Sequence, residues 1–350
     1  MKQEFFGKMS TGEDLSLITL ENKKGMSAVL TDMGACLVRL NVPDKDGITR
    51  DVVLGFPDAE GYEKNACCYG ATIGRSGNRI GNAEFTLNGK KYTLVKNNGE
   101  ANLHSNPDGF YYRKWNFETE EGDDAESVTF FLYSPDGDQG YPGNMDVEVT
   151  YTLTNENELF IQYYGLSDED TIMNMTNHSY FNLNGHDSGD ILNHRVRIDA
   201  DYITLTDPGL VPTGELLDVT GTPFDFREEK TIGQDIDEDF EELTYGHGYD
   251  HNFVVNGGKR VEDAQFIASC TGDKSGITME VYTDLPGVQV FTANTSDYEN
   301  GKDGMHYRPR AAICFETQYA PNAINIPSFE QPVLKKDKED ISLTVYRFTT

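Results

Sequence analysis

Short apolar runs separated by turn residues set the pattern of this chain from its beginning. The first runs are Leu17–Leu20, Ser27–Leu30, Cys36–Leu40 and Val52–Phe56, and Gly, Asn, Asp or Pro residues separate them. Runs of this length between turn residues predict β-strands. The segment from Asp58 to Lys64 differs from them and predicts a short helix.

The strand pattern is clearest in the middle of the chain. In residues Met145 to Thr154 every second side chain is apolar, so the apolar side chains share one face of a strand. Similar runs precede and follow this one. An Asn88-Gly89 turn between two alternating runs is a strong hairpin signal. No stretch shows a sustained helical period, and no Pro-rich linker divides the chain. We therefore predict an all-β fold, a large antiparallel β-sandwich in which residues 1–350 form a single domain.

Two ionisable residues stand out at positions where strands should expose them. His178 follows the strand-like run Thr171–Met175 and precedes an Asn184-Gly185 turn, so its ring can face a cleft from a rigid strand end. An imidazole is the side chain best suited to acid or base work near neutral pH. The alternative is a hydrogen-bonded core histidine. In the run 312–318, alternation places Glu316 on a face with small and amide residues, which suits a cavity better than an apolar core.

Charge limits the classes of partner. The 350 residues carry 29 basic and 59 acidic side chains, a formal net charge of −30. Such a field repels phosphate backbones and anionic lipid, so we expect neither nucleic-acid nor membrane partners. The acidic run at residues 235–242 is interpreted as a solvated surface.

Export and disulfide formation are not expected either. The N-terminus has no apolar h-region, and no run of 18 apolar residues occurs. The five cysteines form an odd set without C-x-x-C spacing: Cys36, Cys67, Cys68, Cys270 and Cys314. We expect a reduced, cytoplasmic protein, and the sequence says nothing of its oligomeric state.

A glycine-rich segment between residues 70 and 81 is a second candidate for chemistry. Its spacing, G-x-x-G-x-x-G, is not the dinucleotide fingerprint, and no strand-turn-helix pattern surrounds it. Its two arginines, Arg75 and Arg79, suit a polar site because guanidinium groups can hold sugar hydroxyls or orient a carboxylate. The alternative is a surface loop with solvated arginines.

Two other chemistries find little support. A serine esterase would need G-x-S-x-G, which is missing from the sequence. His247 and His251 have the i, i+4 spacing of a metal pair, but glycines beside them disfavour a helix there. We therefore expect no metal at these residues.

Six motifs in the chain, taken together and in this order, resemble those of the aldose 1-epimerase (galactose mutarotase) family. They are Gly74-Arg75-x-Gly77-Asn78-Arg79-Ile80, Asn102-Leu103-His104, the segment from Ser134-Pro135-Asp136-Gly137 to Gly140-Tyr141-Pro142-Gly143-Asn144, Thr176-Asn177-His178-x-Tyr180-Phe181-Asn182-Leu183, Tyr249-Asp250-His251-Asn252 and Phe315-Glu316-Thr317-Gln318. They extend from the first third of the chain to its C-terminal strands, so the resemblance covers nearly the whole sequence.

The resemblance implies a galactose mutarotase-like β-supersandwich that interconverts the α and β anomers of free hexoses such as galactose and glucose, without a cofactor. It implies that His178 is the general acid for the ring oxygen and that Glu316 is the base for the C1 hydroxyl. By the same resemblance the substrate-binding residues are Asn78, Arg79, His104, Asp250 and Gln289. Tyr180 and Phe291 are expected to flank the sugar.

The chain departs from the family pattern in one loop. The usual Leu-His-Gly-Gly is Leu103-His104-Ser105-Asn106 here, and Gly77 replaces the usual Ala before Asn-Arg. This difference bears on substrate preference. Two alternatives stay open: a hexose-phosphate mutarotase, for which only Arg113-Lys114 lie near a site motif, and a non-catalytic sugar-binding module.

Overall fold

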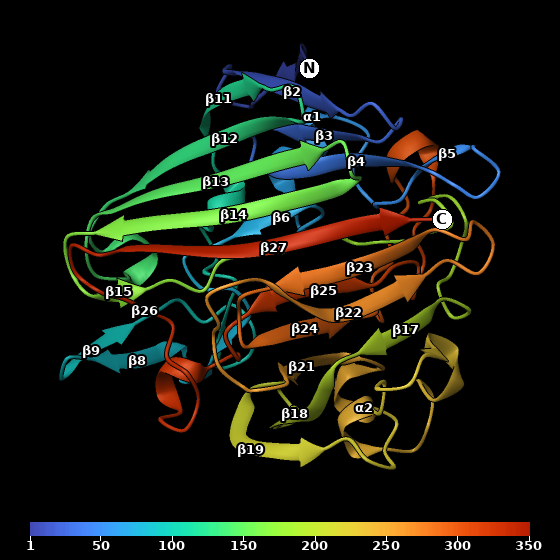
Figure 1. Cartoon of the computed structure of the whole chain (residues 1–350). Coiled ribbons are helices and arrows are strands. Elements are labelled where there is room, and N and C mark those ends of the chain that lie inside the picture. Colours follow the sequence, from blue (N-terminus) through green and yellow to red (C-terminus); the bar gives the residue numbers. More distant parts are fainter.

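A sheet of nine antiparallel strands runs across the whole molecule in the computed structural model, which describes residues 1–350 (Figure 1). In spatial order its strands are β11 (Asn116–Glu121), β12 (Ala125–Ser134), β13 (Met145–Thr154), β14 (Glu158–Ser167), β27 (Glu339–Thr349), β23 (Thr278–Thr283), β22 (Gln265–Thr271), β17 (Arg195–Ile198) and β20 (Lys230–Thr231). Strands β11 to β14 are neighbours in chain order and form a meander. Every second residue of β13 is buried, as its alternation predicts.

Two five-stranded antiparallel sheets complete the main layers. The N-terminal sheet consists of β1 (Lys2–Lys8), β2 (Asp14–Glu21), β3 (Ser27–Thr31), β4 (Cys36–Pro43) and β5 (Thr49–Asp51). The third sheet has the order β19 (Pro212–Asp218), β18 (Ala200–Thr206), β21 (Asp250–Val255), β24 (Gly287–Phe291) and β25 (Cys314–Gln318). In Figure 1 the N-terminal sheet lies in the upper half and the third sheet in the lower half.

Short elements connect these sheets. The two-stranded pairs are β6 (Ala71–Ile73) with β16 (Thr176–His178), β7 (Arg79–Ile80) with β10 (Asn102–Leu103), β8 (Glu84–Leu87) with β9 (Lys90–Thr93), and β15 (Thr171–Ile172) with β26 (Val333–Leu334). The α-helices are α1 (Ala59–Lys64) and α2 (Glu241–Gly246), and single 3₁₀ turns occur at Gly81–Ala83, Phe110–Tyr112, Asp138–Gly140, Ile232–Gln234, Lys302–Gly304 and Ala323–Asn325. Helix α1 confirms the predicted helix, and the Asp58 carboxylate caps its N-terminus. No helix has the length and apolar content needed to cross a membrane.

The main core lies between the nine-stranded sheet and the two smaller sheets. It contains 54 buried residues drawn from all three sheets. From β24 and β25 it takes Val288, Val290 and Phe315, which alternate with Gln289 and Glu316 on the opposite face. The predicted alternation at residues 312–318 is therefore confirmed. The face that carries Glu316 is turned away from the main core, and this frees it for a site.

Candidate active site

His178 is fixed by a short strand pair. Strand β16 pairs with β6, where His178 lies opposite Ala71. The predicted strand Thr171–Met175 ends earlier, at Ile172. The Asn174 backbone N–H donates instead to the Arg75 carbonyl, and the Asn174 side-chain oxygen accepts from the Tyr319 backbone N–H. The ring of Tyr180 stacks on the His178 imidazole with centroids 4.9 Å apart and an interplanar angle of 12°. His178 is 5% exposed, so the stacked imidazole is held in one orientation at the base of a cavity.

Glu316 approaches His178 from the third sheet. Its Oε1 lies 3.6 Å from His178 Nε2, and the residue is 2% exposed. Neither Glu316 Oε2 nor His178 Nδ1 has a hydrogen-bond partner within the protein. The structure therefore brings the two expected catalytic groups face to face and leaves hydrogen-bonding capacity free on both.

Burial sets the protonation of this pair. It lowers the pKa of His178 to about 4, against a smaller raising effect of the Asp250 carboxylate. Burial also raises the pKa of Glu316 well above its usual range, and Asp250 adds to that rise while Arg79 opposes it. Both shifts favour the uncharged form of the pair, with a neutral His178 and the proton on Glu316.

Side chains that can hold sugar hydroxyls surround the pair. Arg79 Nη2 lies 3.7 Å from Asp250 Oδ2, and both residues line the cavity. The Asn78 backbone N–H donates to His104 Nδ1 at 3.1 Å, so the neutral His104 ring carries its proton on Nε2. His104 packs edge-on against the His178 ring. The set combines donors and an acceptor, as hydroxyl recognition requires.

The cavity has a volume of about 450 Å³. It is lined by Ala66, Cys67, Cys68, Asn78, Arg79, Leu103, His104, His178, Tyr180, Asp250, Phe291, Thr295, Ser296, Asp297 and Glu316. Tyr180 and Phe291 thus lie where aromatic walls were expected. Arg79 is the only arginine or lysine in the lining, and two further carboxylates share the cavity with Glu316.

Gln289 differs from the other expected binding residues because it does not line the cavity. It lies opposite Glu316 in the sheet, and its Nε2 donates to Asp250 Oδ1 at 2.7 Å. The amide therefore orients Asp250, and a direct contact with sugar stays a prediction.

Comparisons with known proteins agree with this geometry. The family model described as aldose 1-epimerase matches residues 16–347. The chain belongs to the aldose 1-epimerase family. A galactose mutarotase of Bos taurus is 40% identical over 317 residues, 90% of this chain and 89% of that protein. An aldose 1-epimerase of Haemophilus influenzae is 39% identical over 320 residues, 91% of each protein.

Solved structures show the same fold. An aldose epimerase homologue from C. elegans superposes with a TM-score of 0.86 at 33% identity, covering 95% of this chain and 98% of that one. A galactose 1-epimerase from Lactobacillus acidophilus superposes with a TM-score of 0.87 at 27% identity, covering 100% and 99%. The predicted all-β class is confirmed by these folds and by the sheets themselves.

In the loop that departs from the family pattern, Ser105 makes two hydrogen bonds to the neighbouring loop at Ser76. Ser105 Oγ accepts from the Ser76 backbone N–H at 2.9 Å and donates to the Ser76 carbonyl at 3.0 Å. His104 and Ser105 both have positive φ, which explains why glycine is usual after the histidine. The serine hydroxyl ties the two site loops together, so His104 keeps its place without the glycines.

One of the two arginines in the glycine-rich segment is structural. Arg75 is fully buried and donates to the Ser134 hydroxyl and to carbonyls of the turn between Ser134 and Gly143. The family motif at Ser134–Asn144 therefore encloses a guanidinium group and contributes nothing to the cavity. Of the two arginines only Arg79 lines the cavity, and its contact with sugar stays a prediction.

The interpretation of residues 235–242 as a solvated run is wrong at its last residue. Glu242 is 4% exposed, and its Oε2 lies 3.1 Å from His251 Nε2. The Asp250 backbone N–H donates to the other ring nitrogen of His251 at 3.1 Å. His251 and Glu242 thus hold α2 against β21 directly behind Asp250. The sequence could not predict this role, because nothing in the composition of the acidic run distinguishes Glu242 from its neighbours.

The rim segment Thr295–Asp297 and Cys67-Cys68 were not predicted from the sequence. The polar run Asn294-Thr295-Ser296-Asp297 directly after a strand was the available signal. The phosphate alternative gains no support, because Arg113 is paired with Asp108 and Asp138 outside the cavity.

Nitrogen or oxygen atoms of His104, His178 and Glu316 lie within 4.8 Å of one another and are the one group that resembles a metal site. However, the Asn78 N–H occupies the lone pair of His104 Nδ1, so His104 Nε2 keeps its proton. A metal there would have to break that hydrogen bond. His247, at the C-terminus of α2, is not part of this group, and His251 is engaged by Glu242.

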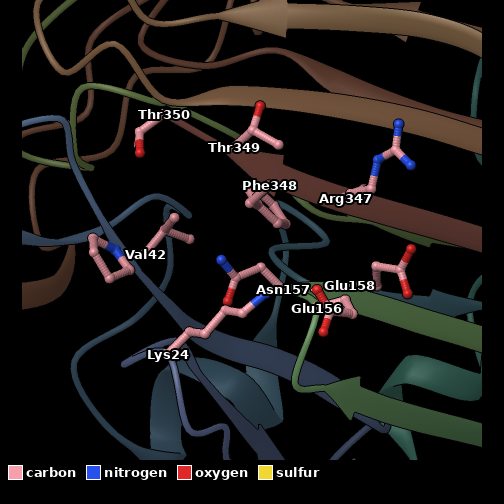
Figure 2. Close-up of a pocket in the computed structure, with 10 residues that line it drawn as sticks. Lys24, Val42, Glu156, Asn157, Glu158, Arg347, Phe348, Thr349 and Thr350 are labelled. Carbon is pink, nitrogen blue, oxygen red and sulfur yellow. Dashed lines mark hydrogen bonds and ion pairs between the residues drawn. The ribbon is translucent and has the colours of Figure 1, made fainter.

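A larger hollow elsewhere lacks acid–base chemistry. Figure 2 shows this hollow of about 580 Å³, where β27 passes the turn between β13 and β14. Both basic residues of its lining are paired, Lys24 with Glu156 and Arg347 with Glu280. The size of a hollow is thus a poorer guide to the site than the chemistry of its lining.

Proposed function

We propose that His178 and Glu316 are the acid and base with which this aldose 1-epimerase interconverts the α and β anomers of free hexoses such as galactose and glucose. The observation that carries the proposal is the approach of His178 Nε2 to Glu316 Oε1 at 3.6 Å, on the floor of a cavity lined by hydroxyl-binding groups. The names of the relatives, galactose mutarotase and aldose 1-epimerase, support the substrate class.

Ring opening needs two proton transfers. His178 Nε2–H donates its proton to the ring oxygen, while Glu316 accepts the proton of the C1 hydroxyl. The bond between C1 and the ring oxygen breaks as the C1 carbonyl forms. Rotation about C1–C2 then presents the other carbonyl face, and return of both protons closes the ring as the opposite anomer. The enzyme ends each cycle with the protons it began with.

One acid and one base are enough for this reaction. Mutarotation proceeds unaided in water, so its barrier is moderate. A positioned acid or base contributes about 10²–10⁴-fold each. Positioning of the sugar by Arg79, His104 and Asp250 adds an orientation term.

Two of the proposed binding residues, Asp250 and Arg79, also favour the ionised form of the pair, in which His178 carries the proton and Glu316 is a carboxylate. The reaction as drawn starts with the proton on His178, whereas burial favours the proton on Glu316. Asp250 raises the pKa of His178, and Arg79 lowers the pKa of Glu316. Both effects oppose desolvation and favour the productive ion pair. The two forms of the pair hold the same number of protons, so pH does not change their ratio.

Polarimetry on freshly dissolved α-galactose and α-glucose tests the activity. We expect the optical rotation to reach its equilibrium value faster with protein than without it, at a rate proportional to protein concentration. A rate equal to that of the buffer blank with both sugars, and with other free aldoses, would contradict the proposal and leave a sugar-binding sandwich.

We also infer that residues 1–350 form one domain and that the protein acts in the cytoplasm. The shared core of 54 residues, drawn from both halves of the chain, supports the first inference. The second is supported by the five cysteines, which are all free thiols.

A further inference from the structure

A row of buried polar side chains leads away from Glu316 across the third sheet. The register pairs Glu316 of β25 with Gln289 of β24, and Gln289 with Asn252 of β21. Ile203 of β18 pairs with Phe253, which brings Thr204 level with Asn252. Directly opposed residues in a sheet have neighbouring side chains on one face. The four side chains therefore form a continuous row that starts at the catalytic carboxyl.

The row lacks the hydrogen bonds that its burial requires. Its four members are at most 3% exposed, and unpartnered atoms occur on each of them. These atoms are Thr204 Oγ1, Asn252 Oδ1 and Nδ2, Gln289 Oε1 and Glu316 Oε2, and both amide atoms of the neighbouring Gln318 are also unpartnered. Buried polar groups are almost always hydrogen-bonded to protein or ordered water, because an unpaired one is costly.

One amide of this row packs over a glycine. Gly287 lies opposite Gln318, and a methyl group on Gly287 would meet Asn252 Oδ1 at 2.6 Å. The Asn252 amide therefore lies over the glycine, in the space that a side chain would otherwise fill.

The far end of the row reaches a second pocket. This pocket has a volume of about 130 Å³, and its lining includes Thr204 and Asn252 together with Pro286, Ala320 and Phe329. It shares no lining residue with the active-site cavity. The polar row thus runs from Glu316 in the lining of the active-site cavity to Asn252 and Thr204 in the lining of the second pocket.

We propose that ordered water molecules along this row hydrogen-bond to Asn252, Gln318 and Glu316 Oε2, so that the row forms a water-filled passage between the catalytic carboxyl and the second pocket. The inference deepens the proposed function, since it assumes that Glu316 is the base. Water bound to Oε2 stabilises the carboxylate from behind while the sugar occupies the side that faces His178.

The passage gives the proton of Glu316 a second route. The carboxyl can pass its proton to the first water, and each water can pass one on, so that a proton leaves at the second pocket and the carboxylate remains. No other reactant is needed. The sugar covers the mouth of the main cavity during turnover but leaves this route open.

Crystallography at a resolution that shows ordered water tests the passage directly. We expect water within hydrogen-bonding distance of Glu316 Oε2 and of the Asn252 and Gln318 amides. A dry row, or side chains that pair with one another, would overturn the proposal without affecting the roles of His178 and Glu316.

A plug in the passage tests its effect on the base. Gly287 has no positive φ, and the added methyl of Gly287→Ala would lie 2.6 Å from Asn252 Oδ1 and 3.3 Å from the Gln318 carbonyl, so the Asn252 amide has to shift from its place in the row. Loss of a hydrogen bond to the carboxylate should move the basic limb of the kcat/KM profile upward by about one pH unit, since such a bond is worth about one pKa unit or more. We also expect kcat to fall by about tenfold, because less of the pair is in its charged form.

Two comparisons make this test specific. Asn252→Leu keeps the approximate size of the side chain and removes two polar atoms of the row, so it should shift the limb in the same direction. Gly122→Ala, in the exposed turn between β11 and β12, is the control and should leave the profile unchanged. Folding of each variant is checked by thermal melting. A fall in kcat with an unmoved basic limb in both row variants would show a merely structural role and overturn the passage.

Discussion

Two buried histidine–glutamate pairs in this chain have the same chemical groups and opposite surroundings. His178 and Glu316 lie 3.6 Å apart beside a cavity, with an unpartnered atom on each residue. His251 and Glu242 lie 3.1 Å apart, and the second ring nitrogen of His251 accepts from the Asp250 N–H. The pair at the cavity is left short of hydrogen bonds, whereas the pair behind it is saturated.

The surroundings shift the pKa values of the two carboxyl groups, Glu316 and Glu242, in opposite directions. Burial raises the pKa of Glu316, and Arg79 offsets only part of the rise. Burial also acts on Glu242, but hydrogen bonds from His251 and Thr206 outweigh it and lower the pKa of Glu242. A carboxyl with its partners in place is a fixed structural anion, and a carboxyl without them is free to exchange a proton with substrate.

The largest effect is expected when either member of the cavity pair is replaced. His178→Gln and Glu316→Gln keep approximate size and lose acid or base capacity, so each should lower kcat by at least ~10²-fold. The double variant should fall far short of the product of the two losses, because residues that act as a unit are not additive. Stopped-flow polarimetry measures all three, and multiplicative losses would contradict a concerted pair.

The pH dependence follows from the one proton that the pair holds. As pH falls through about 4, neutral His178 takes up a proton while Glu316 keeps its own. The pair then has no base, and kcat/KM drops by about tenfold per pH unit. As pH rises through the raised pKa of Glu316, the pair loses its only proton and its acid. We expect a bell-shaped profile that is flat between these limbs, and an acid limb near the ordinary pKa of histidine would contradict it.

The sequence indicated that His178 and Glu316 face a cavity because the signals for this are local. Strand alternation placed Glu316 on the correct face, and the family motif supplied the role of His178. The saturated pair was missed, since Glu242 and His251 meet only through the packing of α2 on β21. Arg75 shows the same limit: an arginine in a polar loop looks alike whether it faces a cavity or, as here, the carbonyls of a distant turn.

The all-β class followed from strand spacing, but the strand order did not. The insertion of β27 between β14 and β23 joins residues far apart in the chain, and no local pattern encodes that pairing. Contacts between distant parts of the chain also form the cavity, since His178 lies on β16 and Glu316 on β25.

A smaller effect is expected at Asp250, which lines the cavity of one pair and binds the histidine of the other. Asp250 accepts from Gln289 Nε2 and lies near Arg79, while its backbone N–H binds His251. An amide offers one acceptor oxygen where the carboxylate offers two. Asp250→Asn should therefore raise KM by about tenfold, the value of one hydrogen bond to a charged group, with a smaller loss of kcat.

The matched control for that variant is Asp297→Asn. Asp297 also lines the cavity, but its side chain is 61% exposed at the rim. We expect its KM to stay within about twofold of the wild-type value, because exposed charges contribute little. Steady-state polarimetry decides between the two, and equal KM values for the two variants would remove Asp250 from the binding set.

The smallest expected effect is that of metal removal. The His104 tautomer and the proton held by the cavity pair leave no ready metal site, so the reaction should rely on side chains alone. Activity after exhaustive EDTA treatment and dialysis should equal that of untreated protein. Loss of activity that a single divalent ion restores would overturn the side-chain mechanism.

The most direct test of the account is the same substitution in both pairs, Glu316→Gln and Glu242→Gln, measured by polarimetry and by urea unfolding. We predict that Glu316→Gln loses at least ~10²-fold in kcat and stays folded. Glu242→Gln should keep kcat within about fivefold and lose about 1–3 kcal/mol of unfolding free energy. A Glu316→Gln enzyme with a near-wild-type rate would contradict the assignment of the catalytic pair.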